Sequence, residues 1–355
     1  MRQKGFTFVE LMIAIAVTVT VMIAAMSLYQ KSVQVSAVVT QQSEMQNELR
    51  AAMNQLARDL NQAGTAVPIA GISIPSAATG TNPKFACDFT PPCYITAGNR
   101  FTQGMLHKVN PANGVGPNVL QPTDAIIITY KDPTLNWTAY QTQTGTVSGN
   151  RITMPAGTTP PLNDPAVGLV VGDVLLLQNT NGARVGVVTN FDNGTRQVNF
   201  ANGDPLNMNQ SAATGGNIKS LEFSPVPGAA PYYPWITVSR LMMVTYFISQ
   251  INTPSGPDTR LMRQVGARTP IPVADHIEDL QFTYDVIDSD TSVPTTGLPD
   301  AAVGTPPTPV PNQIRKINIT MTVRSPRRNA QGQFDHYTLT TSIGPRNLSF
   351  QPRYN

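Results

Sequence analysis

The stretch KGFTFVEL at residues 4–11 opens an apolar run that continues to Tyr29 and contains one formal charge, Glu10. At about 1.5 Å of rise per residue, a helix over residues 6–29 spans roughly 36 Å, enough to cross a hydrocarbon core of about 30 Å. Arg2 and Lys4 precede the run, and basic residues favour the cytoplasmic side of a membrane helix. The sequence therefore predicts a transmembrane helix whose N-terminus is cytoplasmic.

Two features distinguish this segment from a cleavable secretion signal. The apolar run exceeds the roughly 7–15 residues of a signal's hydrophobic region, and Gly5 and Phe6 stand before it. A charge inside a membrane helix costs about 2.5–3.5 kcal/mol, so Glu10 needs a partner. Cleavage after Gly5 would make the α-amine of Phe6 that partner, in the same chain or in the next subunit. The alternative is a plain signal anchor whose Glu10 side chain reaches the membrane surface.

Residues 5–11, GFTFVEL, resemble the class III signal of type IV pilins and pseudopilins. The resemblance implies a leader peptide at residues 1–5, cleaved between Gly5 and Phe6 by a prepilin peptidase that also methylates Phe6. It also implies that the Glu10 carboxylate docks neighbouring subunits. One departure is visible, because many major pilins carry a helix-kinking proline in this helix and none stands near Ser27.

The apolar pattern of one helix continues beyond the membrane. Five apolar residues recur at helical spacing: Met45, Leu49, Met53, Leu56 and Leu60. The charged residues Glu44, Glu48, Arg50, Arg58 and Asp59 are assigned to the other faces. Gly64 offers a C-terminal stop. We expect one helix over residues 6–63, about 85 Å long, with residues 6–29 in the membrane and residues 30–63 packed on an extracytoplasmic domain.

Composition places the body of the chain outside the cytoplasm. The 355 residues include 26 Gly and 31 Pro, and charged residues make up 13%, against roughly 25% in ordinary soluble proteins. These values favour a turn-rich β body of one large or two modest domains over a cytosolic enzyme. The formal charge of +3 gives no overall attraction to nucleic acid.

The body divides into three expected segments. Residues 64–122 are rich in Gly and Pro and predict loops. A first β block is expected over residues 123–249 and a second over residues 250–355, with an exposed Pro/Thr/Gly-rich loop at residues 288–312. The expected strands lie at 123–130, 168–171, 173–178, 183–189, 240–248, 260–265, 274–285, 313–324 and 337–343. The predicted fold class is α+β, a long N-terminal transmembrane pilin helix packed on a β-rich domain of antiparallel sheets.

Cys87 and Cys93 lie in the loop-rich segment, in CDFTPPC. In an exported chain, such a pair predicts a local disulfide that closes a small surface loop. A metal site is disfavoured, because there is no second cysteine pair and the three histidines, His107, His276 and His336, are scattered along the chain.

The order of the body motifs extends the resemblance to the PilW-type minor pilins, which are related to the J-type pseudopilin of type II secretion. The motifs include IEDLQFTY at residues 277–284 and PRNL at residues 345–348. The resemblance implies a minor pilin of a type IV pilus that joins other minor pilins and the major pilin in an initiation or tip complex. It also implies a single pass through the bacterial inner membrane, a periplasmic body, and later a place at the pilus tip or cell surface. The alternative within the family is a J-type pseudopilin at the tip of a type II secretion pseudopilus.

No enzyme signature is present in the body. Motifs for phosphate binding, for zinc hydrolases and for a serine nucleophile are absent, so we expect no catalytic residue and no cofactor. Asp285, Asp288 and Asp290 could offer oxygen ligands to Ca²⁺. The turn glycine and distal glutamate of an EF-hand are missing, which favours a solvated acidic turn.

The C-terminal segment is rich in arginine: Arg324, Arg327, Arg328, Arg346 and Arg353. Such a patch could contact DNA phosphates or an acidic partner. Because no aromatic residues are interleaved with the arginines, we favour a solvated or protein-interface face over nucleic acid. A tip adhesin or DNA-capture subunit is therefore the alternative function of another class.

Overall fold

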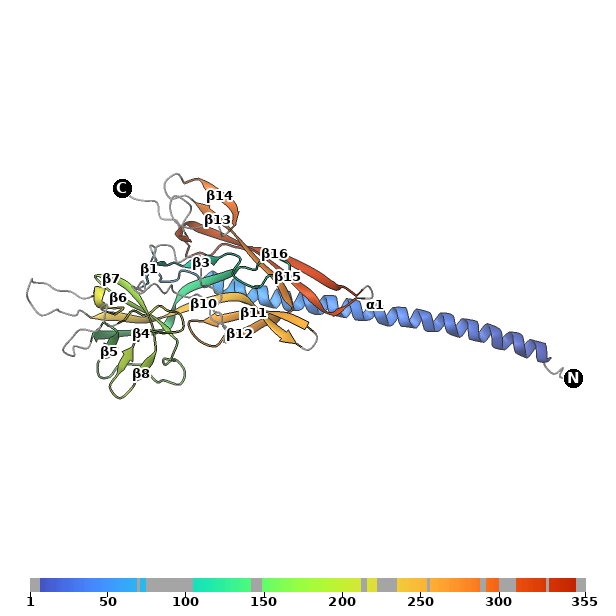
Figure 1. Cartoon of the computed structure of the whole chain (residues 1–355), viewed down its shortest axis with the longest axis horizontal. Coiled ribbons are helices and arrows are strands. Elements are labelled where there is room, and N and C mark those ends of the chain that lie inside the picture. The colour runs from blue at the N-terminus through green and yellow to red at the C-terminus, as the bar shows by residue number, and fades with distance from the viewer. Residues whose placement is uncertain are drawn as a thin grey trace, which may run out of the picture.

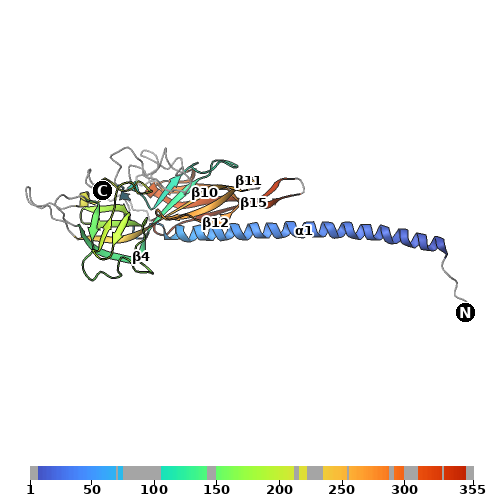
Figure 2. The same cartoon turned by 60° about the horizontal axis from the view of Figure 1, so that its bottom comes forward.

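The computed structural model describes residues 7–68, 71–74, 105–141, 149–211, 216–221, 235–253, 256–287, 292–299, 311–329 and 332–348. These residues form one long helix and a β domain that packs against the C-terminal half of the helix (Figure 1). The N-terminal half of the helix stands clear of the β domain in Figure 1 and in the turned view of Figure 2. The predicted α+β class is confirmed.

Helix α1 runs from Phe8 to Gln62 over 55 residues. Gly64 follows with φ +78°, a left-handed conformation that glycine adopts without strain. Among the described residues, α1 is the one helix long and apolar enough to cross a membrane. The predicted continuous helix is thus confirmed for its described part.

The apolar stripe on α1 is buried along its whole length, from Met45 to Leu60. It packs in one core cluster with residues from two sheets, which include Ile126, Ile128, Tyr246, Ile317, Ile319 and Met321. The predicted packing of this stripe on the β-rich domain is confirmed, and α1 contributes to a core that both sheets share. The location of this domain outside the cytoplasm stays a prediction.

The first sheet has 12 strands. Their bounds are β1 (Ile72–Ser73), β2 (Met105–Leu106), β3 (Val109–Ala112), β4 (Ala125–Gln141), β5 (Arg151–Thr153), β6 (Val174–Asn179), β7 (Gly182–Val187), β8 (Asn190–Asp192), β9 (Gln197–Asn199), β10 (Ile236–Thr253), β11 (Gly256–Val265) and β12 (Ile271–Asp275). The order is β2-β1-β7-β6-β10-β4-β5-β9-β8, with β3 beside β4, and β11 linking β10 to β12. The β1–β7 pair is parallel and the other pairs are antiparallel.

The second sheet has 4 antiparallel strands in the order β14-β13-β15-β16. Their bounds are β13 (Ile277–Ile287), β14 (Pro294–Pro299), β15 (Ile314–Arg328) and β16 (Phe334–Ile343). Two short 3-10 helices are η3 (Lys219–Leu221) and η5 (Pro311–Gln313). The strand expected at residues 313–324 is confirmed as part of β15, in which Ile317, Ile319, Met321 and Val323 are buried.

The sheet limits differ from the expected blocks. The expected boundary at residues 249 and 250 falls inside β10, and the first sheet ends only at β12. Strands β1 to β3, from the segment expected to be loops, also belong to the first sheet. The reason is that β10 pairs with β4, β6 and β11 at once, so cross-strand hydrogen bonds rather than chain order set the limit.

Strand β4 continues to Gln141, past residue 130, where it was expected to end, and it includes Pro133. The β4–β10 register breaks between Ser239 and Leu241, so Pro133 lies at an irregularity in the ladder. Proline is tolerated there, because its missing N–H is not required for pairing.

Two short segments also differ from expectation. Residues 294–299, within the expected loop at 288–312, form the exposed edge strand β14, which pairs with β13. Residues 168–171, expected to be a strand, lie in a loop, where the Gly168 and Leu169 amides donate to the carbonyls of Asp164 and Leu162 at 2.8 and 2.7 Å. These local bonds replace the cross-strand bonds of a ladder.

Candidate functional site

The start of α1 is closed by a reciprocal cap between Thr7 and Glu10. The Thr7 amide and hydroxyl donate to Glu10 Oε2 at 2.9 and 3.0 Å, and the Glu10 amide donates to Thr7 Oγ1 at 3.3 Å. A carboxylate at a helix N-terminus is stabilised by the helix dipole. The Glu10 carboxylate is therefore held at the residue that follows Phe6.

The N-terminal half of α1 is a mostly apolar surface that none of the described residues covers. Side chains from residue 7 to residue 40 are exposed. Between Glu10 and Glu44 the sequence carries one charged residue, Lys31. Such a surface requires either lipid or other apolar helices as its surroundings.

The C-terminal half of α1 is held by a buried carboxylate, Asp59, which is 3% exposed. Arg263 of β11 donates to it from Nε at 2.7 Å and from Nη2 at 3.3 Å. The hydroxyls of Tyr246 on β10 and Tyr130 on β4 donate to the same carboxylate at 2.6 and 3.4 Å. One helical side chain is thus bonded to three neighbouring strands of the first sheet.

The charges of this cluster support one another. Burial raises the pKa of Tyr130 to about 12, with the Asp59 charge adding to the rise. Burial opposes the charge on Arg263, yet its hydrogen bonds and ion pair with Asp59 raise its pKa overall. Burial likewise raises the pKa of Tyr246. Both phenols therefore stay protonated and donate to Asp59, and Arg263 keeps its positive charge.

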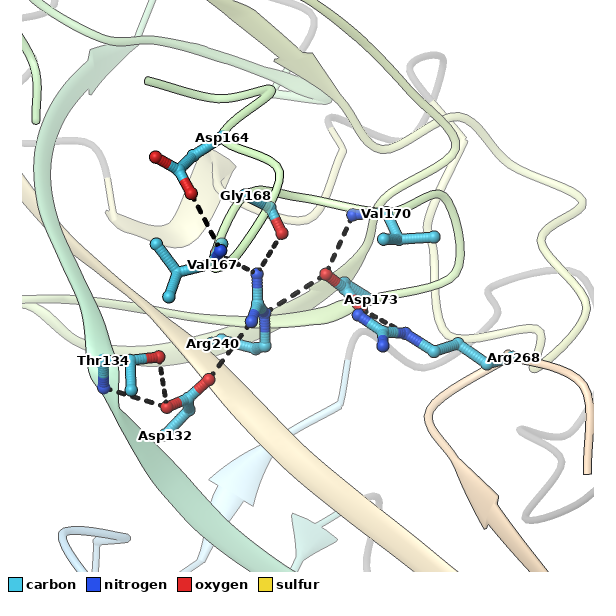
Figure 3. A network of polar contacts seen from close by, with 9 residues as sticks. All are labelled: Asp132, Thr134, Asp164, Val167, Gly168, Val170, Asp173, Arg240 and Arg268. Atoms are coloured by element: carbon cyan, nitrogen blue, oxygen red, sulfur yellow. Dashed lines mark hydrogen bonds and ion pairs between the residues drawn. The ribbon is translucent and has the colours of Figure 1, made fainter. Parts of the chain in front are cut away.

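A second buried network, drawn in Figure 3, centres on Arg240 of β10. Its Nη1 pairs with Asp132 at 3.2 Å and its Nη2 donates to the Val167 carbonyl at 2.7 Å. Its Nε forms an ion pair with Asp173 at 3.2 Å without hydrogen-bond geometry. Arg268 donates to Asp173 from Nε at 2.8 Å. Asp132 and Asp173 are thus each paired with arginine, and the network attaches the loop before β6 to the sheet.

A third charged cluster joins the two sheets. Arg324 of β15 contacts Asp258 of β11 at 2.9 Å and Glu278 of β13 at 3.0 Å. His276 Nδ1 lies 2.8 Å from Asp258, and His336 Nε2 lies 2.9 Å from Glu278. Arg324 is 9% exposed, so the expectation of a solvated or interface role is wrong for this arginine. It belongs to an internal ion-pair cluster.

The other predicted site residues divide into two groups. Gly5, Phe6, Cys87, Cys93, Asp288, Asp290 and Arg353 lie outside the described residues, so cleavage, methylation, the disulfide and part of the Ca²⁺ candidate stay predictions. Asp285 accepts from the Gly297 amide at 2.8 Å and pairs with Lys316 at 3.5 Å. The described residues contain no group of three or more His, Cys, Asp or Glu side chains suited to a metal ion.

Asp59 was assigned to an outer face of the helix, and this assignment is wrong. It follows Leu56 by three positions, so both residues lie on the same helical face, and both are buried. The three-residue spacing between Leu56 and Asp59 could have indicated that Asp59 lies on the buried face. What the sequence alone did not supply was the arginine that compensates the charge, 204 residues further along the chain.

Comparison with protein families gives one match, in which residues 1–26 fit the prokaryotic N-terminal methylation motif. Comparisons with curated proteins and with solved structures give no match. The motif indicates a type IV pilin-like or pseudopilin prepilin, a structural rather than enzymatic kind of protein. Together with the apolar half of α1, it indicates anchoring in the inner membrane and association with other pilins and a prepilin peptidase.

Proposed function

We propose that this protein is a minor pilin of a type IV pilus that primes filament assembly with other minor pilins and the major pilin. The observation that carries the proposal is the methylation motif at the head of an exposed, nearly uncharged half-helix. The opposite half of the same helix is built into a β domain. A J-type pseudopilin of type II secretion would have the same N-terminal parts, and the identity of co-purified subunits separates the two.

The proposed mechanism begins with cleavage after Gly5 and methylation of Phe6. Apolar helices in lipid pack without a preferred axial offset, whereas a charge pair makes wrong offsets costly. The Glu10 carboxylate lies beside the Thr7 amide at 2.9 Å, at the end of the helix where the new α-amine forms. We propose that it binds the α-amine of a neighbouring subunit and so sets the register.

The test is Glu10→Leu, with Glu44→Leu as the matched control at an exposed carboxylate of the same helix. We expect both variants to insert and to start at Phe6 in N-terminal sequencing. We expect Glu10→Leu alone to lose co-purification with partner pilins, because an amine in lipid is left unpaired, a loss of several kcal/mol. Glu10→Asp should retain part of the co-purification, because it keeps the charge and shortens the side chain by one methylene.

Two outcomes would contradict the proposal. Normal filament initiation by Glu10→Leu would show that the carboxylate has no docking role and would leave the plain signal anchor. A mature chain that starts at Met1 would show that pilin-like cleavage after Gly5 does not occur.

A further inference from the structure

The β15–β16 hairpin is the part of the β domain that reaches furthest along α1 toward its N-terminus (Figure 1, Figure 2). Both strands contact α1. The end of this hairpin, where β15 stops at Arg328 and β16 starts at Phe334, is therefore the part of the β domain nearest to the membrane half of the helix.

The hairpin end carries two arginines that face solvent. Pro326, Arg327 and Arg328 are exposed, and the Arg327 side chain has no partner among the residues that the structure describes. Arg328 lies 4.5 Å from the Phe334 ring centre and donates from Nη1 to the Gly332 carbonyl at 2.7 Å. This contact orders the Arg328 side chain and leaves its other N–H groups available.

The hairpin is tied to the rest of the β domain close to its end, at Arg324 of β15. Arg324 is bound to Asp258 and Glu278, and its guanidinium also lies over Phe334, at 4.2 Å from the ring centre. Arg327 and Arg328 therefore lie at the end of a hairpin that the ion pairs of Arg324 with Asp258 and Glu278 hold in place.

The neighbouring part of α1 offers these arginines no acid, because Lys31 is its one charge between Glu10 and Glu44. The first helix residue with reduced exposure is Gln41, roughly 18 Å along the axis from Tyr29. The headgroup layer takes up about 5–8 Å of that distance, and charges act over about 8 Å at physiological salt. A helix tilt of about 20°, usual for membrane helices, brings one side of the β domain down to this layer.

We propose that Arg327 and Arg328 dock on anionic phospholipid headgroups of the membrane that α1 crosses, and that this contact sets the direction in which the β domain leans. The inference rests on membrane anchoring and does not require the minor-pilin role. It describes the subunit before assembly, so the Glu10→Leu result leaves it intact.

The test uses the full-length chain in nanodiscs of phosphatidylcholine alone or of an equimolar mixture with phosphatidylglycerol. Hydrogen–deuterium exchange is followed over residues 325–336. We expect slower exchange with the anionic lipid, an effect abolished by Arg327→Gln/Arg328→Gln and by high salt. Each arginine should change the docking equilibrium roughly fivefold.

The matched control is Arg346→Gln, which removes an exposed arginine beyond the opposite end of β16. It should keep the lipid effect, and exchange in β13 and in the rest of β15 should be the same in all variants, which shows that the fold is intact. Equal exchange in both lipids overturns the proposal. So does protection by added duplex DNA without a response to anionic lipid, which would assign the arginines to nucleic acid.

Discussion

The two halves of α1 belong to one unbroken helix but differ in what surrounds them. Residues 7–40 are exposed although most of them are apolar, whereas the segment from Met45 to Leu60 buries one face, and that face includes the charged Asp59. From hydropathy alone, the apolar N-terminal half would be expected to be buried and the more polar C-terminal half to be exposed. The outer half, residues 7–40, therefore needs lipid or other subunits to cover its apolar side chains. The inner half, from Met45 to Leu60, packs its apolar face on the β domain of the same chain.

The largest expected effect concerns the charge of the inner half. Asp59→Asn keeps the side-chain shape but leaves the half-buried Arg263 without its carboxylate, and the loss of one partner of a buried ion pair costs about 3–5 kcal/mol. We expect the free energy of unfolding of the β domain, measured by denaturant titration in detergent, to fall by this amount. Arg58→Gln, the exposed neighbour, should change it by at most about 0.5 kcal/mol. Equal effects of the two substitutions would refute the role given to Asp59.

A second prediction separates the halves by packing. Leu56 is fully buried and Leu28 is 71% exposed. Leu56→Ala should destabilise the β domain by about 2–5 kcal/mol, because it opens a cavity in a core shared by two sheets. Leu28→Ala should leave this stability unchanged in the same titration. If both variants unfold alike, the outer half contributes to the fold and the comparison fails.

A third, smaller effect is a pH dependence of the β domain, on which the inner half of α1 packs. Burial raises the pKa of Asp124 to about 6, although hydrogen bonds from the Phe282 and Gly114 amides oppose the rise. The folded state thus holds this proton more tightly than the unfolded state. The stability contribution is complete below pH of about 4 and is lost as the pH rises through about 6, at most about 3 kcal/mol.

The variant Asp124→Asn isolates this contribution. Burial also lowers the pKa of His107 to about 4, which gives the opposite slope, since stability falls when the pH drops below the ordinary histidine pKa. The wild-type minus variant difference in unfolding free energy should therefore decrease from about pH 4 to about pH 7. A difference independent of pH would show that Asp124 is not perturbed.

The helix and most strands were predictable because their signals are local. The spacing of Met45, Leu49 and Met53 is enough to place one face of α1 in the core. The strands expected at residues 173–178 and 183–189 likewise correspond to the antiparallel pair β6 and β7. These elements need no information from distant parts of the chain.

The polar clusters depend on partners far away in sequence, so they were missed. Arg324 meets Asp258 only after the two sheets assemble, across 66 positions, and in the sequence it was one of several C-terminal arginines. The edge strand β14 likewise forms only because β13 offers it a ladder. Residues 294–299 were expected to form a loop because the segment is rich in proline, and composition carries no information on the pairing with β13.

The attachment of Asp59 to β4, β10 and β11 also determines how the molecule carries load. A pull along α1 enters the β domain through the buried half of the helix, whose axis runs alongside the long strands in Figure 1. The load is then borne in shear, by many side-chain contacts and the Asp59 bonds together, rather than by peeling one contact at a time. Tension is passed on to β10, which is hydrogen-bonded to β4, β6 and β11. The helix thus transmits tension directly to β4, β10 and β11, three hydrogen-bonded strands of the first sheet.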